Sequence, residues 1–191
     1  MPGEARKRGG RRVISWNMMS LDGLFEGSAP WELDWHEKVW GDELEKISLE
    51  QLEAAGALLF GRKTYEGMAA YWPNAVGRVA ELMNALPKLV FSGTLKAAEW
   101  DNVRLVTGPA EDEVARLKDE PGGDLFVFGS AGLADSLRNR GLIDEYRVGL
   151  CPILLGEGTP LFKPNDERLY LTLLEARPMG DGVVVLRYAP R

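Results

Sequence analysis

Two short apolar strands that each stop at a glycine and lead directly into a helix constrain this chain most. The first, residues 57–60, stops at Gly61, and the second, residues 124–128, stops at Gly129. A strand that passes at once into a helix is the repeating unit of a parallel sheet with helices on its faces. The two turns therefore predict an α/β fold.

The same alternation continues along the rest of the chain. Further strands are predicted at residues 12–19, 88–91, 103–106 and 143–150, and helices at residues 42–55, 62–70, 76–86, 109–118 and 131–140. Residues 169–176 and 182–188 are predicted to close the sheet as an antiparallel pair. We expect a three-layer α/β/α sandwich with a mixed, mostly parallel sheet. No repeat or linker divides residues 12–191, which we predict to be one domain behind a disordered basic arm, residues 1–11.

Charge and composition exclude several classes of function. Residues 1–12 hold five basic residues and Glu4, a net charge of +4 in a chain of net charge −6, so the remainder carries −10. An acidic body argues against a nucleic-acid partner. No apolar run approaches the roughly 20 residues of a membrane helix, and no secretory signal is present, so we expect a cytoplasmic location. One cysteine, Cys151, and one histidine, His36, predict no metal site.

The two glycine turns have the chemistry of an anion site. Helix N-termini present free N–H groups and a positive dipole end, and glycine lets a phosphate approach the backbone. Arg62 could clamp a phosphate, with Lys63 and the Thr64 hydroxyl beside it. The alternative for each turn is plain: the glycine only ends a strand, or allows close packing of helix on sheet. Because a dinucleotide needs more than one anchor, the pair predicts a nicotinamide dinucleotide, although no G-x-G-x-x-G fingerprint is present.

Nearly the whole chain, from about residue 12 to residue 188, resembles one superfamily. LLFGRKTYEGM (residues 58–68) resembles the adenine-nucleotide segment of dihydrofolate reductases. FVFGSAGLADSL (126–137) and GLIDEYRVGLCPILLGEGTPLF (141–162) are similar to the reductase half of the riboflavin-biosynthesis deaminase-reductase, as is MSLDG (19–23). The resemblance implies a dihydrofolate-reductase-like fold, NADPH as hydride donor, and a homodimer. It also implies that the peptide between Gly129 and Ser130 can be cis.

The resemblance also carries cofactor contacts onto individual residues. Those it implies are Met18, Asp22, Gly61, Arg62, Thr64, Phe91, Ser92, Gly129, Ser130, Ala131, Gly132 and Leu133. The first two match the nicotinamide side, and Phe91 and Ser92 match a strand end beside the adenosine. The turn of residues 129–133 matches the segment that binds the pyrophosphate.

Aromatic residues mark the expected substrate end. Phe25, Trp31 and Trp35 crowd one loop and could form an apolar wall for a flat ring, or pack ordinarily beneath a long loop. Tyr65 and Met68 are candidates for the same pocket, with the core as the alternative. Asp34 and Glu37 are the candidates to protonate or orient the substrate, although solvated side chains are the simpler reading of both. His36 is a weaker candidate for a general acid.

These features predict an NAD(P)H-dependent oxidoreductase that transfers hydride to a small pterin-, pyrimidine- or ribosylamino-type molecule. The most similar named activity is that of the 5-amino-6-(5-phosphoribosylamino)uracil reductase of riboflavin biosynthesis. Two alternatives stay open: a dihydrofolate or dihydropterin reductase, and a non-catalytic nucleotide-binding module. The chain departs from both families near the substrate. The riboflavin reductases carry a D-D-P stretch that binds the phosphosugar, and residues 65–73 of this chain, at the matching place, do not contain it. Dihydrofolate reductases carry a buried carboxylate near the substrate, and no carboxylate of this chain matches it unmistakably.

Overall fold

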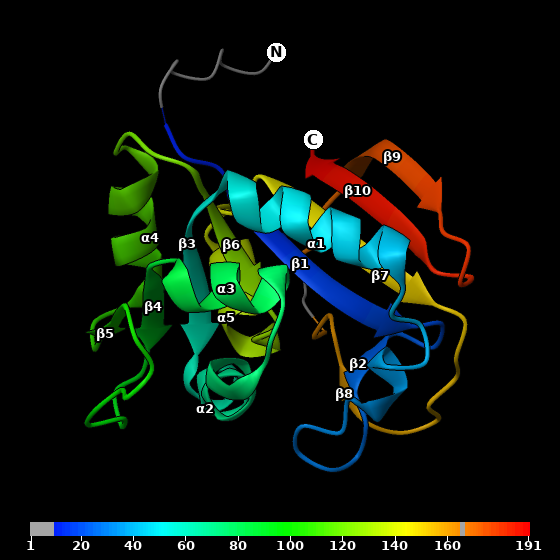
Figure 1. The fold of residues 1–191 in the computed structure, drawn as a ribbon. Helices are drawn as coiled ribbons and strands as arrows, with labels where there is room; N and C mark the ends of the chain where they lie inside the picture. Colours follow the sequence, from blue (N-terminus) through cyan, green and yellow to red (C-terminus); the bar gives the residue numbers. More distant parts are fainter. Residues whose placement is uncertain (1–9, 165–166) are drawn as a thin grey trace.

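An eight-stranded sheet runs through the centre of the computed structural model, which describes residues 10–164 and 167–191 (Figure 1). Its order is β5-β4-β3-β6-β1-β7-β10-β9. The strands are β1 (Val13–Ser20), β3 (Ala55–Gly61), β4 (Lys88–Phe91), β5 (Val103–Val106), β6 (Asp124–Phe128), β7 (Glu145–Cys151), β9 (Leu171–Pro178) and β10 (Val184–Pro190). The strands from β5 to β7 are parallel, whereas β10 runs antiparallel to both β7 and β9.

Helices cover both faces of the sheet. On one face lie α1 (Asp42–Ala54), α2 (Arg62–Tyr71) and α3 (Arg78–Ala85), and on the other lie α4 (Ala110–Lys118) and α5 (Ala131–Asn139) (Figure 1). Alternate strand residues divide between the two cores: Ile14 and Phe60 belong to the α1 side, Val13 and Leu59 to the α5 side. Such alternation is what a strand buried on both faces requires. The predicted three-layer sandwich with a mixed, mostly parallel sheet is confirmed.

The shortest elements were not predicted. β2 (Leu24–Glu26) pairs with β8 (Thr159–Pro160) in a separate two-stranded ribbon, and single 3-10 turns occur at η1 (Asp34–His36) and η2 (Trp72–Asn74). A two- or three-residue strand has no periodicity to read, so only its distant partner defines it. The closing hairpin lies about two residues later than predicted, because its apolar alternation extends beyond the paired residues.

The basic arm predicted before the domain is only partly described. Most of the predicted basic arm, residues 1–9, lies outside the described residues. Arg11 is described, and its Nε donates to the Gly123 carbonyl at 2.7 Å. Among the described residues, no helix is both long and apolar enough to cross a membrane.

A buried carboxylate joins β7, β10 and the residue before β1 at the end of the sheet away from the glycine turns. Glu145 on β7 is 3% exposed and accepts hydrogen bonds from Arg187 at 2.6 Å and from Arg147 at 2.7 Å. Arg12 lies 3.3 Å from its other oxygen. Burial alone would raise the pKa of Glu145, but the hydrogen bonds from Arg187 and Arg147 outweigh it, so the pKa is lowered.

Candidate functional site

One serine joins the two glycine turns. Ser130 Oγ accepts the Gly61 N–H at 2.8 Å and donates to Thr64 Oγ1 at 2.7 Å, and Ser130 is only 7% exposed. The first contact joins the end of β3 to the turn after β6, because β3 and β6 are neighbours in the parallel sheet. The turns that the sequence singled out therefore lie side by side at the carboxyl edge of the sheet, where ligands of open α/β sheets bind.

Both helices begin without a side-chain cap. Neither α2, which follows Gly61, nor α5, which follows Ser130, has a side-chain hydrogen bond to its first turn. The first-turn N–H groups of a helix have no partner within the helix. Two uncapped N-termini held together present two sets of donors and two positive dipole ends to one ligand.

The backbone of the second turn is unusual. Gly129 and Ser130 both have positive φ, 61° and 56° respectively. Serine rarely occupies this left-handed region, which costs an L-residue about 1–2 kcal/mol. A side chain at residue 129 would approach Thr64 Cγ2 to 3.1 Å, so a glycine is needed there for the contact between the turns. No cis peptide bond occurs in residues 10–164 and 167–191, so the bond from Gly129 to Ser130 is trans here.

Basic side chains stand at the entrances of both helices. Arg62, on the first turn of α2, is exposed and pairs with Glu66 at 2.9 Å, one helical turn away. Lys63 is also exposed. At α5, Lys163 Nζ would lie 3.8 Å from a Cβ at Gly132. Sequence reasoning missed Lys163, because only the tertiary fold brings residue 163 to a helix that begins at residue 131.

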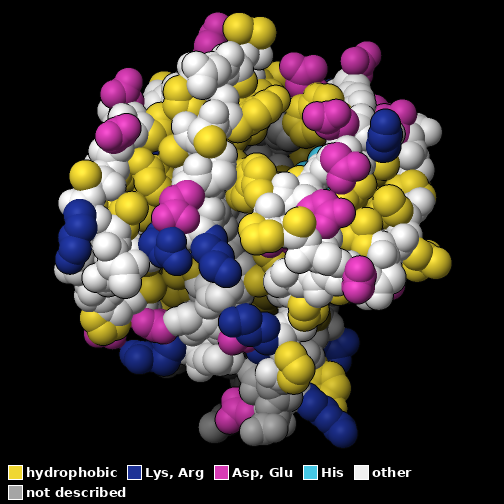
Figure 2. Space-filling view, turned by 90° about the horizontal axis from the view of Figure 1, so that it is seen from below, with side chains coloured by type: hydrophobic (Ala, Val, Ile, Leu, Met, Phe, Trp, Pro, Cys, Tyr) yellow, Lys and Arg dark blue, Asp and Glu magenta, His cyan; other side chains and the backbone are white. Residues whose placement is uncertain are grey.

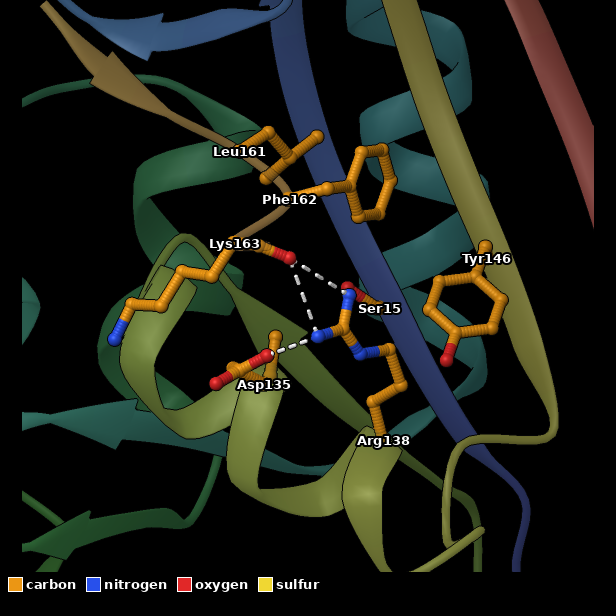
Figure 3. A pocket seen from close by; sticks show the side chains of 8 residues that line it. Ser15, Asp135, Arg138, Tyr146, Leu161, Phe162 and Lys163 are labelled. Carbon is orange, nitrogen blue, oxygen red and sulfur yellow. Dashed lines mark hydrogen bonds and ion pairs between the residues drawn. The ribbon is translucent and has the colours of Figure 1, made fainter. Parts of the chain in front are cut away.

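A small cavity lies beneath Lys163 on the α5 side of the sheet (Figure 3). Arg138 reaches across it from α5, paired with Asp135 and donating to the Lys163 carbonyl at 3.4 Å. The Lys163 ammonium group points away from this cavity in Figure 3. Arg138 therefore fixes the backbone of residue 163 and leaves its side chain beside the start of α5.

The predicted nicotinamide and adenosine residues lie at two strand ends of the same edge. Met18 is half-buried near the end of β1, and Phe91 ends β4. Ser92 Oγ accepts the backbone N–H groups of Thr94 at 3.2 Å and Leu95 at 3.0 Å. The Ser92 hydroxyl thus stabilises the turn after β4.

Asp22 holds the turn after β1 to a distant segment. Its carboxylate accepts the Ser20 hydroxyl at 2.6 Å and the N–H groups of Gly156 at 2.7 Å and Leu155 at 3.2 Å. The bonds from Ser20 and Gly156 lower the pKa of Asp22 to about 2. Both oxygens are engaged, so its evident role in this structure is to position the turn beside Met18.

The aromatic loop closes over α2. A Cβ on Gly67 of α2 would overlap the indole ring of Trp31, so the ring lies directly on the helix backbone. Trp31 has a φ of 66°, and its N–H donates to the Glu26 carboxylate five residues earlier. Trp35 is 3% exposed and belongs to the α1-side core, while Phe25 on β2 is half-buried. Of the three predicted wall residues, Trp31 is the one that bridges the loop and α2.

Tyr65 and Met68 of α2 both have structural partners outside the helix. The Tyr65 hydroxyl accepts the N–H groups of Glu99 at 3.1 Å and Trp100 at 3.4 Å. Met68 Sδ accepts the indole N–H of Trp72 at 3.0 Å. Tyr65 thereby ties α2 to the loop before β5, and it lines a groove between them that also contains Ala69.

A hollow opens between the α2 side of the molecule and the side formed by β2 and the loop of residues 27–40 (Figure 2). Hydrophobic side chains line it, and the histidine colour within it belongs to His36, the one histidine of the chain. Burial lowers the pKa of His36 to about 4, against the opposing effect of Asp34, so the ring is neutral at pH 7. The candidate acids Asp34 and Glu37 are exposed near it, on and just after η1.

The family follows from the sequence comparison. The sequence model of the RibD C-terminal domain matches residues 11–185, nearly the whole chain. The chain belongs to the RibD C-terminal domain family. Membership supports a reductase of the riboflavin-biosynthesis type, as the similarity of residues 126–162 to that reductase implied.

Individual relatives and solved structures match this chain over nearly its whole length. YyaP of Bacillus subtilis (strain 168), an uncharacterised protein, is 32% identical over 188 residues, covering 93% of this chain and 94% of its own. A protein named for riboflavin biosynthesis from Shewanella sp. PV-4 superposes with a TM-score of 0.77 at 24% identity, covering 94% of this chain and 99% of its own. Dihydrofolate reductase from Enterococcus faecalis, complexed with NADP(H), superposes with a TM-score of 0.63 at 15% identity, covering 94% and 96%. The dihydrofolate-reductase-like fold is confirmed.

Proposed function

We propose that this RibD-type domain is an NADPH-dependent reductase that transfers hydride to a small pterin-, pyrimidine- or ribosylamino-type substrate. The observation that carries the proposal is the pair of uncapped helix N-termini that Ser130 holds side by side. A dinucleotide has separate phosphates to anchor, and this arrangement offers separate anion sites at one sheet edge.

The chain's own groups would divide the cofactor between them. The first-turn amides of α5 would donate to the pyrophosphate, with Lys163 adding a positive charge at the same helix end. At α2, Arg62 and Lys63 would favour a 2′-phosphate, so NADPH is preferred to NADH. Arg62 would have to leave Glu66, an exposed pair whose loss costs little.

Catalysis in this proposal consists mainly of positioning. NADPH supplies the hydride when it is bound, and the protein holds the two reactants in contact and limits access of water. Trp31, lying across α2, would cover the hollow next to the carboxyl edge. Neutral His36 has too low a pKa to act as a proton donor at pH 7, so water would deliver the proton that accompanies the hydride. The most similar named reaction is the reduction of 5-amino-6-(5-phosphoribosylamino)uracil.

NADPH titration followed by calorimetry tests the cofactor site. Gly132→Asp places a carboxylate on the first turn of α5, at an exposed position where a Cβ meets nothing closer than 3.8 Å. We expect it to weaken NADPH binding at least about tenfold, because like charge opposes the pyrophosphate. Arg140→Gln, just beyond the other end of α5, makes the same change in net charge and should leave binding unchanged. A wild-type protein that shows no NADPH binding would refute the proposal.

We further propose that the protein is a cytoplasmic homodimer that acts on a small molecule, without nucleic acid or membrane. The outermost strand, β9, supports a second copy, because its side chains Leu173 and Leu174 are each about half exposed. An unpaired apolar edge strand is a ready partner for another chain. Light scattering on the eluted protein should give twice the monomer mass, and Leu173→Lys should reduce it to the monomer.

A further inference from the structure

Carboxylates outnumber basic residues on the two walls of the hollow. Residues 65–73, on the α2 side, contain Glu66 and neither lysine nor arginine. On the other side, residues 26–43 contain six carboxylates and one lysine, Lys38. Figure 2 shows the same asymmetry: Asp and Glu gather on the right of the hollow, while most Lys and Arg lie to the left and below.

The loop carboxylates are exposed or accept hydrogen bonds from backbone N–H groups. Glu32 accepts the Ala29 N–H at 2.8 Å, and Glu26 accepts the Trp31 N–H. Asp34 and Glu37 are exposed, with no ion pair to any described residue. Negative potential therefore extends over the substrate side of the molecule, opposite in sign to the helix N-termini at the cofactor end.

The uncharged groups of the hollow suit a flat, polar ring. Trp35 Nε1 and His36 Nε2 are buried without a hydrogen-bond partner in the described structure. Trp35 is 3% exposed, so its orphan donor is an unusual cost in a well-packed core. Both atoms are buried, so the accessible aromatic surface comes from the Trp31 ring, which is 40% exposed and could stack on a heterocycle without requiring charge.

We propose that the substrate of this site is a flat, electron-poor heterocycle without a phosphate group, neutral or cationic, and that the acidic loop of residues 26–43 excludes phosphorylated analogues. The proposal rests on the proposed function and narrows its substrate class. A phosphate dianion would lose its hydration near six carboxylates, and residues 65–73 hold no arginine or lysine to replace that hydration. The absence of the D-D-P phosphosugar stretch agrees with a substrate that has no phosphate group.

The chemistry balances without a charged catalytic residue. Hydride from NADPH adds to the carbon of a C=N bond, the π electrons pass to nitrogen, and water supplies one proton to that nitrogen. The products are the amine, NADP⁺ and hydroxide.

A matched pair of ligands tests the inference. The protein, saturated with NADP⁺, is titrated with 5-amino-6-(ribosylamino)uracil and with its 5′-phosphate, and binding is followed by tryptophan fluorescence. We expect the unphosphorylated compound to bind at least about tenfold more tightly than its 5′-phosphate at low salt. This gap, the ratio of the two dissociation constants, should narrow as salt screens the carboxylates. The double substitution Asp34→Asn and Glu37→Gln should narrow the gap about threefold, whereas Glu53→Gln, exposed on α1, should not change it.

Several results would overturn the inference. Equal or tighter binding of the 5′-phosphate would do so, as would a gap that neither salt nor the double substitution alters. Failure of both compounds to bind would also overturn it, because the proposed ring class would then be wrong. The proposed function is judged separately, by the NADPH titration, so each claim can fail alone.

Discussion

Ser130 offers the sharpest test of how the two glycine turns are held together. Its hydroxyl makes two buried hydrogen bonds, to the Gly61 N–H and to Thr64 Oγ1. Ser130→Ala removes both and leaves the Gly61 N–H without its acceptor. At about 1 kcal/mol for each bond, with a further penalty for an unsatisfied buried donor, the loss should be about 2–3 kcal/mol. The melting temperature should fall by about 4–12 °C in a chain of this size.

Ser130→Gly separates hydrogen bonding from backbone strain. It loses the same two bonds, but glycine adopts the observed φ of 56° without the left-handed penalty of about 1 kcal/mol. The glycine variant should therefore be more stable than the alanine variant by about 1 kcal/mol, and less stable than wild type. Urea denaturation of the three proteins gives both differences. An alanine variant as stable as wild type, or a glycine variant less stable than alanine, would refute this reasoning.

Three further predictions follow from named contacts. Gly67→Ala should displace the Trp31 ring from α2 and raise the KM for the organic substrate more than that for NADPH, measured by steady-state kinetics; an unchanged tryptophan emission would contradict the displacement. Glu145→Gln should cost about 2–4 kcal/mol in urea unfolding at pH 7, because three arginines lose their shared anion. The pKa of Glu145 is lowered in the folded state, so its carboxylate stabilises the fold at pH values above the pKa it has in the unfolded chain. This stabilisation is lost as the pH falls. The difference in free energy of unfolding between wild type and Glu145→Gln should therefore shrink below about pH 4. Cys151 is 1% exposed and burial raises its pKa to about 11, so a thiol reagent should label it only after unfolding.

The sequence predicted the frame of the molecule well where elements are long and regularly patterned. The strands of residues 57–60 and 124–128 and the helices that follow them lie where their periodicity indicated. The ribbon of β2 and β8 was missed, since each strand is too short to show a period and they join segments far apart in the chain.

The candidate site divides in the same way. Glycine turns before a helix are local signals, so Gly61 and Gly129 could be singled out from the chain alone. Their joining by Ser130, the approach of Lys163 to α5 and the contact of Trp31 with Gly67 are contacts between distant segments, which no local pattern encodes. Ser130 itself was selected for its place in a turn, and its hydroxyl proved to be the link.

What the sequence alone determined is therefore the order and type of the main elements, and the positions where anions could meet the backbone. Periodicity and glycine placement act over a few residues, so they can be read without a fold. The tertiary structure decided which of these positions share one edge. It also decided that the acidic loop of residues 26–43 lies across the hollow from residues 65–73, which contain no lysine or arginine. The shared edge depends on the parallel pairing of β1, β6 and β3. The pairing of β3 with β6 brings Gly61 into contact with Ser130, 69 residues further along the chain.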